Sequence, residues 1–128
     1  DVISLGGMKL TILHHPGHTK GSCSYLFTVK DDQRKYRVLI ANMPTILDNV
    51  KPAGMPGYAN VGKDFEYTYS VMPKLTFDIW LAAHASQFGL HTKHRPGDKY
   101  KPAAFIDRKG YDKLLAKLHA DYMAKKGK

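Results

Sequence analysis

Between two apolar runs the chain reads His14-His15-Pro16-Gly17-His18-Thr19-Lys20-Gly21-Ser22. Leu10–Leu13 precedes this stretch and Tyr25–Phe27 follows it, which predicts a tight loop between two strands. The Pro16-Gly17 pair lets the backbone bend sharply just before His18. Three imidazoles within so few residues suit a metal ligand at the end of a strand. The same loop also fits a polar hairpin with incidental histidines, and the composition alone does not choose between the two.

Four β-rich runs lie around this loop, two on each side. Val2–Leu5 and Lys9–Leu13 are separated by Gly6-Gly7, which is typical of a two-residue hairpin turn. Ser24–Val29 and Lys35–Ile40 are separated by a short charged turn. The N-terminal third of the chain is therefore predicted to form a meander of these four strands.

The segment 41–60 contains repeated prolines and glycines that break any regular element. A loop of this length within one domain often forms a wall or a lid of a site. Residues 61–75 fit either an alternating strand or a helical face, and their length favours a helix that ends near Pro73.

The remainder of the chain is predicted to contain one buried strand and one long helix. Leu75–Ala83 is almost wholly apolar, which predicts a strand that ends at His84, and residues 85–101 are predicted to form a loop. Asp107 is a suitable N-cap for a helix over residues 108–125, where apolar residues recur at spacings of three and four.

The composition indicates one domain of ordinary size. The chain has 128 residues, of which 43% are hydrophobic, so it is long enough to bury a core and is not a disordered sequence. No apolar run approaches the roughly 20 residues of a membrane helix, and the first residues do not resemble a signal peptide. Cys23 is the only cysteine, which excludes an intrachain disulfide, and we expect it to be a small buried residue.

The net charge of +9 favours anionic partners. Much of the excess lies near the C-terminal end, where a solvated helix face explains it. A basic nucleic-acid-binding or scaffold domain is the alternative that this charge supports, and salt-dependent DNA binding would test it.

By position, two histidines are the best candidates for metal ligands. His18 and His84 each follow an apolar strand and lie on loops, where the sites of a sheet commonly assemble. We expect His91, His94 and His119 to be exposed, and one of the pair at 14 and 15 to support the loop through a hydrogen bond. Catalytic zinc usually takes three protein ligands, so the residues by themselves offer only half of a metal site.

Two blocks of sequence resemble a known family. Residues 10–24, LTILHHPGHTKGSCS, resemble the Gly-His-Thr motif of the metallo-β-lactamase superfamily. Residues 84–91, HASQFGLH, resemble the last ligand motif of the third zinc subclass of metallo-β-lactamases. The resemblance implies an α+β fold in which residues 1–128 are a single unit, the C-terminal half (one βα layer pair) of an αβ/βα four-layer sandwich. The family's N-terminal half carries a His-x-His-x-Asp-His motif, which is absent here.

The resemblance also implies roles for individual residues. His18 would be the third histidine of the first zinc site and His84 the histidine of the second, in a complete enzyme that binds two zinc ions. Met43 would occupy the place of a bridging ligand without binding zinc, and Thr45 would help to hold the carboxylate of the substrate. Three serines would support the site through hydrogen bonds or hold its loops: Ser22, Ser24 and Ser86.

The implied function is zinc-dependent hydrolysis of the amide of β-lactam antibiotics, in the periplasm or outside a Gram-negative bacterium. Related hydrolases such as glyoxalase II place a metal-bridging aspartate where this chain has Asn42-Met43-Pro44-Thr45, which favours a lactamase over an enzyme for lactones or thioesters. We expect this chain alone to be inactive and to need the missing half, or another copy of itself, against its sheet. No nucleic acid or membrane partner is expected.

Overall fold

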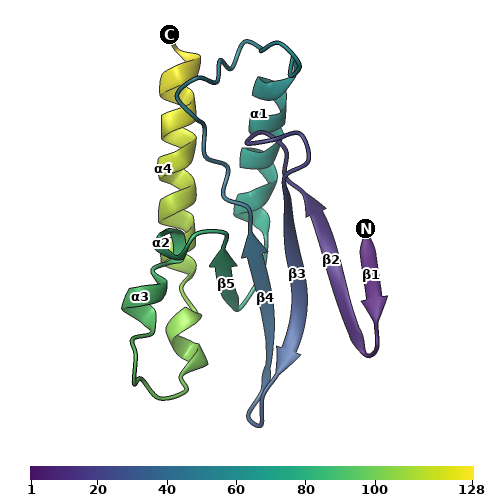
Figure 1. The fold of residues 1–128 in the computed structure, drawn as a ribbon, viewed down its shortest axis with the longest axis vertical. Coiled ribbons are helices and arrows are strands. Elements are labelled where there is room, and N and C mark those ends of the chain that lie inside the picture. The colour runs from purple at the N-terminus through teal and green to yellow at the C-terminus, as the bar shows by residue number, and fades with distance from the viewer.

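A five-stranded mixed sheet forms the centre of the fold in the computed structural model, which describes all residues from 1 to 128 (Figure 1). Its spatial order is the order of the chain. The strands are β1 (Val2–Leu5), β2 (Met8–His14), β3 (Cys23–Lys30), β4 (Lys35–Ala41) and β5 (Ile79–Ala82). The first four pair antiparallel, so the predicted meander is confirmed, whereas β5 pairs parallel to β4.

Helices connect and cover the sheet. They are α1 (Val61–Val71), η1 (Met72–Lys74), α2 (Ala85–Phe88), α3 (Leu90–Lys93), η2 (Pro102–Phe105) and α4 (Arg108–Lys126). The crossover that the parallel strand β5 requires runs through α1, and this confirms the prediction of a helix for the ambiguous segment. At the start of α4 the Asp107 carboxylate accepts a hydrogen bond from the Gly110 N–H at 3.0 Å, as expected of an N-cap. None of the helices is both long and apolar enough to cross a bilayer.

Two local predictions were wrong. Residues 85–101 begin with two short helices in place of a loop, because Gly89 adopts a left-handed conformation (φ 68°) that ends α2 and starts α3. The strand predicted over Leu75–Ala83 is shorter, since its parallel pairing with β4 begins only at Ile79. Cys23 is half-buried at the start of β3, where its thiol donates to the Gly21 carbonyl.

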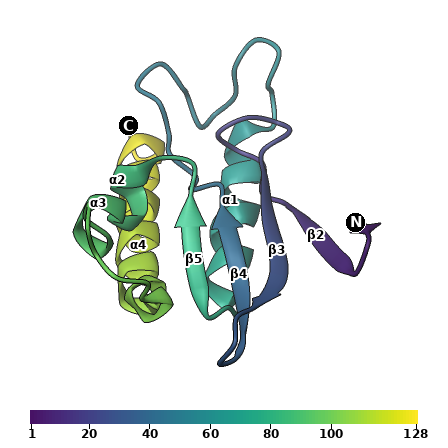
Figure 2. The ribbon, with the colours of Figure 1, turned by 60° about the horizontal axis from the view of Figure 1, so that its bottom comes forward.

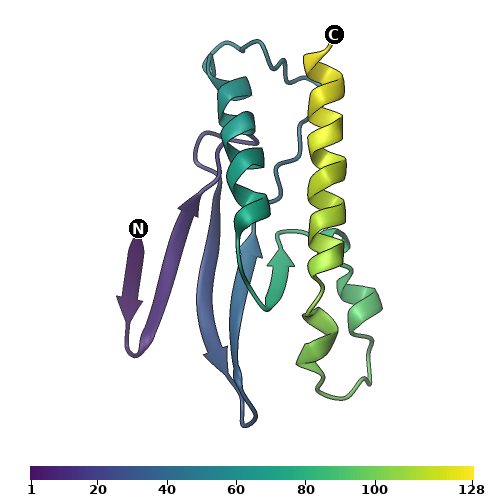
Figure 3. The same ribbon diagram turned by 180° about the vertical axis from the view of Figure 1, so that it is seen from behind.

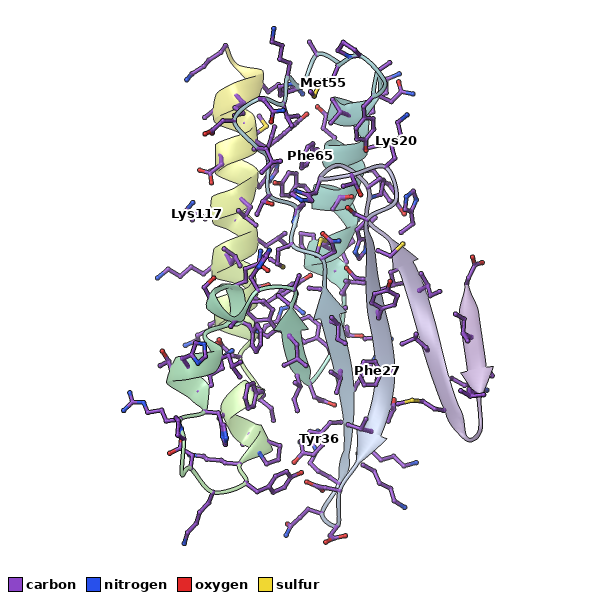
Figure 4. All side chains as sticks on the ribbon, in the orientation of Figure 1. Lys20, Phe27, Tyr36, Met55, Phe65 and Lys117 are labelled. Carbon is purple, nitrogen blue, oxygen red and sulfur yellow. The ribbon has the colours of Figure 1, made fainter.

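One face of the sheet packs against α1 and α4 to form the core. The strand register places Leu26 opposite Leu39 and Leu39 opposite Trp80, and all three side chains are buried on this face. Figure 3 shows α1 and α4 side by side on this side of the sheet. The ring of Phe65, labelled in Figure 4, lies between the two helices with its centroid 5.4 Å from that of Tyr122.

The other face of the sheet is also apolar but only partly covered: Val38 and Ile79 are buried there, with Phe105 of η2 packed against them. The register places Phe27, Val38 and Ile79 in one row on this face. A hollow of about 460 Å³ lies over them and is lined mostly by apolar residues, among them Val29, which is 37% exposed. β1 is exposed along its whole length. This face therefore offers a docking surface for a second layer.

We expect the isolated chain to self-associate through this apolar face. Sedimentation velocity should show dimers or larger species, and Val29→Lys should shift the distribution towards monomer, because a charge there opposes burial of the face. The matched control is Tyr67→Lys on the outer surface of α1, where the parent side chain is 52% exposed, and it should leave association unchanged. A monodisperse wild-type monomer with a sharp cooperative melt would contradict this expectation.

Candidate functional site

Three segments of the candidate site start at the same edge of the sheet. β2, β4 and β5 run in the same direction, so their C-terminal ends lie together, as their arrowheads show in Figure 1. The segment 15–22 follows β2, the segment 42–60 follows β4, and His84 lies just after β5. In Figure 2 the first two of these loops project beyond the same end of the sheet as the turn between β5 and α2. The fold therefore gathers the predicted site residues that follow these strands at one edge.

The loop at His14–Ser22 is closed by its own hydrogen bonds. The N–H of His15 donates to the Ser22 carbonyl at 2.8 Å, and Nε2 of His14 lies 2.7 Å from the Lys20 carbonyl oxygen. The buried Ser22 hydroxyl accepts from the Thr19 N–H at 3.1 Å and lies 2.9 Å from the Thr19 hydroxyl. These contacts make the stretch a defined turn, in which Ser22 holds the loop together.

A buried polar pair joins this loop to the end of β4. Nδ1 of His15 lies 2.7 Å from the Ser24 hydroxyl oxygen, which also accepts from the main-chain N–H of Asn42 at 2.9 Å. His15 is only 4% exposed, and Ser24 is completely buried. Burial, and to a smaller extent the neighbouring His14, lowers the pKa of His15 from 6.5 to about 4. The ring of His15 is therefore neutral at pH 7.

The chain is expected to lose stability as the pH falls from 6.5 to 4, because His15 takes up a proton at 6.5 when unfolded but only near 4 when folded. Neutral His15 makes its full contribution to the free energy of unfolding above pH 6.5. A pKa shift of this size corresponds to about 3 kcal/mol. Urea unfolding at a series of pH values measures this. In His15→Gln the free energy of unfolding should depend less on pH between 6.5 and 4 than it does in the wild type. His91→Gln, which changes an exposed histidine on α3, should keep the wild-type dependence. Equal profiles for wild type and His15→Gln would refute the assignment.

The geometry of His18 suits a metal ligand. Its Nδ1 lies 2.8 Å from the Thr45 carbonyl oxygen, and 3.0 Å from the Thr45 hydroxyl. A carbonyl only accepts, so Nδ1 carries the proton and the lone pair is on Nε2. A hydrogen bond of this kind orients the metal-binding histidines of many proteins. The half-buried ring of His18 is thus held with a free donor atom, which fits zinc.

His84 lies at the turn between β5 and α2 with an exposed side chain. Its main-chain N–H donates to the Gln87 side-chain oxygen at 3.2 Å, and its carbonyl accepts from the Gln87 N–H at 3.0 Å. These two bonds fix the turn, and the exposed imidazole is free of the core. No side-chain hydrogen bond links His84 to His18 or Thr45. Ser86 is exposed on α2 and makes no side-chain hydrogen bond, so its supporting role stays a prediction.

The segment after β4 is anchored by burial. Met43 is only 3% exposed and belongs to the core, whereas Thr45 is half-buried beside His18. The thioether of Met43 therefore packs against apolar neighbours. The predicted contacts of Met43 and Thr45 with a substrate stay predictions.

The other histidines lie where the sequence predicted them. His91 and His94 are exposed, and so is His119, whose ring stacks on that of Tyr69 with centroids 4.5 Å apart. They do not contribute to the edge that carries His18.

Comparison with known proteins shows what the chain is similar to. No protein-family model and no curated protein matches the chain. Among solved structures, a β-lactamase from Chitinophaga pinensis is 54% identical, with a TM-score of 0.98 over 100% of this chain and 48% of that one. The chain matches one half of a subclass B3 metallo-β-lactamase. It spans about half the length of each solved structure that it resembles.

Two solved metallo-β-lactamase structures show the same similarity. The class B3 di-zinc enzyme LRA-12 from an Alaskan soil metagenome is 57% identical, with a TM-score of 0.94 over 98% of this chain and 47% of that one. GOB-18 from Elizabethkingia meningoseptica is 53% identical, with the same TM-score over 98% of this chain and 46% of its own. The fold prediction, α+β and half of this sandwich, is therefore confirmed.

This chain does not hold a complete metal site. No group of three or more histidine, cysteine, aspartate or glutamate side chains in the chain could bind a metal ion. His18 and His84 stay the two predicted zinc ligands of this chain.

Sequence reasoning missed the residues of α1 that hold this edge in place. The Thr68 hydroxyl donates to the Pro16 carbonyl at 2.6 Å, and the Tyr69 hydroxyl lies 2.5 Å from the Pro44 carbonyl oxygen. Both side chains are buried. The sequence feature that could have indicated them is that both polar side chains lie on the inward face of the helix predicted over residues 61–75.

Proposed function

We propose that this chain is the C-terminal half of a zinc-dependent β-lactamase, to which it contributes His18 and His84 as metal ligands. The observation that carries the proposal is the His18 imidazole, which is fixed by the Thr45 carbonyl with Nε2 free. The support from comparison is the 53–57% identity to halves of three β-lactamases, one of them described as a di-zinc enzyme. The other ligands would come from the half that this chain lacks.

Zinc in such a site supplies a water activated at neutral pH and positive charge for the oxygen of the amide under attack. The chain's own part is to bind and orient. His18 would bind through Nε2, and the Thr45 carbonyl would keep its ring from rotating. His84, on the fixed turn after β5, would bind from the neighbouring strand end.

Thr45 would also meet the substrate. The Nδ1 proton of His18 serves the Thr45 carbonyl, so the Thr45 hydroxyl keeps its own hydrogen for a further acceptor. A β-lactam carboxylate is a suitable acceptor, and the net charge of +9 favours the approach of an anion. Such an enzyme would act in the periplasm or outside the cell, where these drugs are met.

The missing half would pack on the partly covered face of the sheet. Phe27 and Val29 on that face are still partly exposed, so burying them would remove nonpolar surface from water. This packing would bring the remaining ligands to the edge that carries His18.

A chimera tests the proposal. In this chimera, the half of the Chitinophaga pinensis β-lactamase that matches this chain is replaced by the chain, and the other half of that enzyme is kept. The chimera should hydrolyse nitrocefin, lose activity when zinc is chelated and regain it when zinc is restored, whereas the chain alone should show little turnover. A folded, zinc-loaded chimera that cleaves lactones or thioesters but not nitrocefin would favour the other hydrolases of the superfamily.

A further inference from the structure

One turn of α1 touches both loops that meet at His18. The side chains of Phe65, Thr68 and Tyr69 are 0%, 0% and 5% exposed and face the sheet edge from the same side of the helix. They contact the loop after β2 and the segment after β4 at the residues that immediately precede His18 and Thr45. The same helix therefore contacts both the loop that carries His18 and the segment that carries Thr45.

The contacts to the first loop lie at Pro16 and Gly17. The Thr68 hydroxyl donates to the buried Pro16 carbonyl at 2.6 Å. Gly17 lies against the ring of Phe65 so closely that a Cβ there would be 2.8 Å from Phe65 Cδ1. Gly17 also has φ 139°, a conformation that other residues rarely adopt. The backbone just before His18 is therefore fixed from two sides by α1.

The contact to the second loop lies at Pro44. The Tyr69 hydroxyl is 2.5 Å from the Pro44 carbonyl oxygen and 3.0 Å from that of Leu118 in α4. Its single hydrogen serves these two acceptors, so Tyr69 ties the residue before Thr45 to both long helices. Proline has no N–H, so neither Pro16 nor Pro44 adds a backbone donor of its own to hold its loop.

We infer that Thr68 and Tyr69 are positioning residues, which set the orientation of the His18 imidazole by holding Pro16 and Pro44 at a fixed separation. The hydrogen bond from His18 Nδ1 to Thr45 depends on that separation, because each partner directly follows one of the anchored segments. The inference deepens the proposed function and rests on it only for the statement that the oriented ring binds zinc.

The test uses the full chain with Thr68→Val, which keeps the shape and loses the hydroxyl, and Tyr69→Phe, which keeps the ring. Long-range ¹H–¹⁵N spectra of the metal-free chain at pH 8 report the His18 tautomer, in the Val29→Lys background if association broadens the signals. Wild type should show one tautomer with the proton on Nδ1, and both variants should lose this single pattern. Thr68→Ser, which restores a hydroxyl, should recover it.

Ser70→Ala is the matched control, because the Ser70 hydroxyl is exposed and donates only to the Tyr67 carbonyl of the same helix. It should leave the His18 signals unchanged. Each substitution is then placed in the chimera that carries the other ligands, where Thr68→Val should need about tenfold more zinc than the parent chimera to reach half occupancy. Circular dichroism checks that each variant is folded. If Thr68→Val does not fold, the His18 tautomer in Tyr69→Phe tests the inference.

The outcomes separate the inference from the proposed function. If both variants keep the wild-type tautomer and the wild-type zinc midpoint, the two hydroxyls serve packing alone and the inference is wrong. If the variants lose the tautomer while the chimera with His18→Ala keeps its full zinc content, the positioning stands and the proposed role of His18 in zinc binding fails.

Discussion

The His18→Ala variant of the chimeric enzyme is expected to lose at least about 100-fold in kcat/KM for nitrocefin, since a metal contributes several kcal/mol to such reactions and each 1.4 kcal/mol is tenfold. The reason is the single free donor atom that the structure leaves on His18, with Nδ1 held by Thr45. Metal content, measured by mass spectrometry of the purified protein, should fall together with the rate.

His94→Ala is the control for this loss, because His94 is exposed on the loop after α3 and lies apart from the loop that carries His18. It should change neither the rate nor the zinc content. A chimera that keeps full activity and full zinc content without the His18 imidazole would remove this residue from the proposed ligand set.

The Phe65→Ala variant should lose about 3–5 kcal/mol of unfolding free energy, the cost of truncating a fully buried aromatic side chain. Phe65 is 0% exposed, packs beside Tyr122 and lies against Gly17 of the histidine loop. A loss of this size is a large part of the stability of an ordinary domain. Urea unfolding at matched protein concentration measures it, because self-association adds to the apparent stability.

Tyr67→Ala on the same helix is the matched control. Tyr67 is 52% exposed, so its truncation should cost less than about 0.5 kcal/mol. Equal losses for the two variants would mean that α1 does not pack on the sheet through Phe65 as the structure describes.

Local signals predicted most of the fold. The Gly6-Gly7 turn and the apolar runs beside it specified the meander, because turn residues and alternation act over a few neighbours. Asp107 and the apolar spacing after it specified α4 for the same reason. The errors fell on residues 75–101, where the extent of β5 depends on pairing with a strand about 40 positions away, which adjacent residues do not encode.

The sequence also predicted only some of the residues of the candidate site. His18 and His84 were predicted as ligands from their places after apolar strands, and the resemblance to the metallo-β-lactamases assigned them to two zinc ions. Thr68 and Tyr69 were not found, because a threonine and a tyrosine on an amphipathic helix look like ordinary packing residues. Their carbonyl acceptors lie 52 and 25 positions away.

The sequence alone determined the strands around the histidine loop, the capped C-terminal helix and the relation to one half of a metallo-β-lactamase, since each depends on residues close together in the chain. Only the tertiary structure decided which imidazole nitrogen of His18 is free, that Ser24 joins His15 to the end of β4, and that α1 anchors both loops. These are contacts between distant segments, and their geometry arises only when the sheet and the helices pack together.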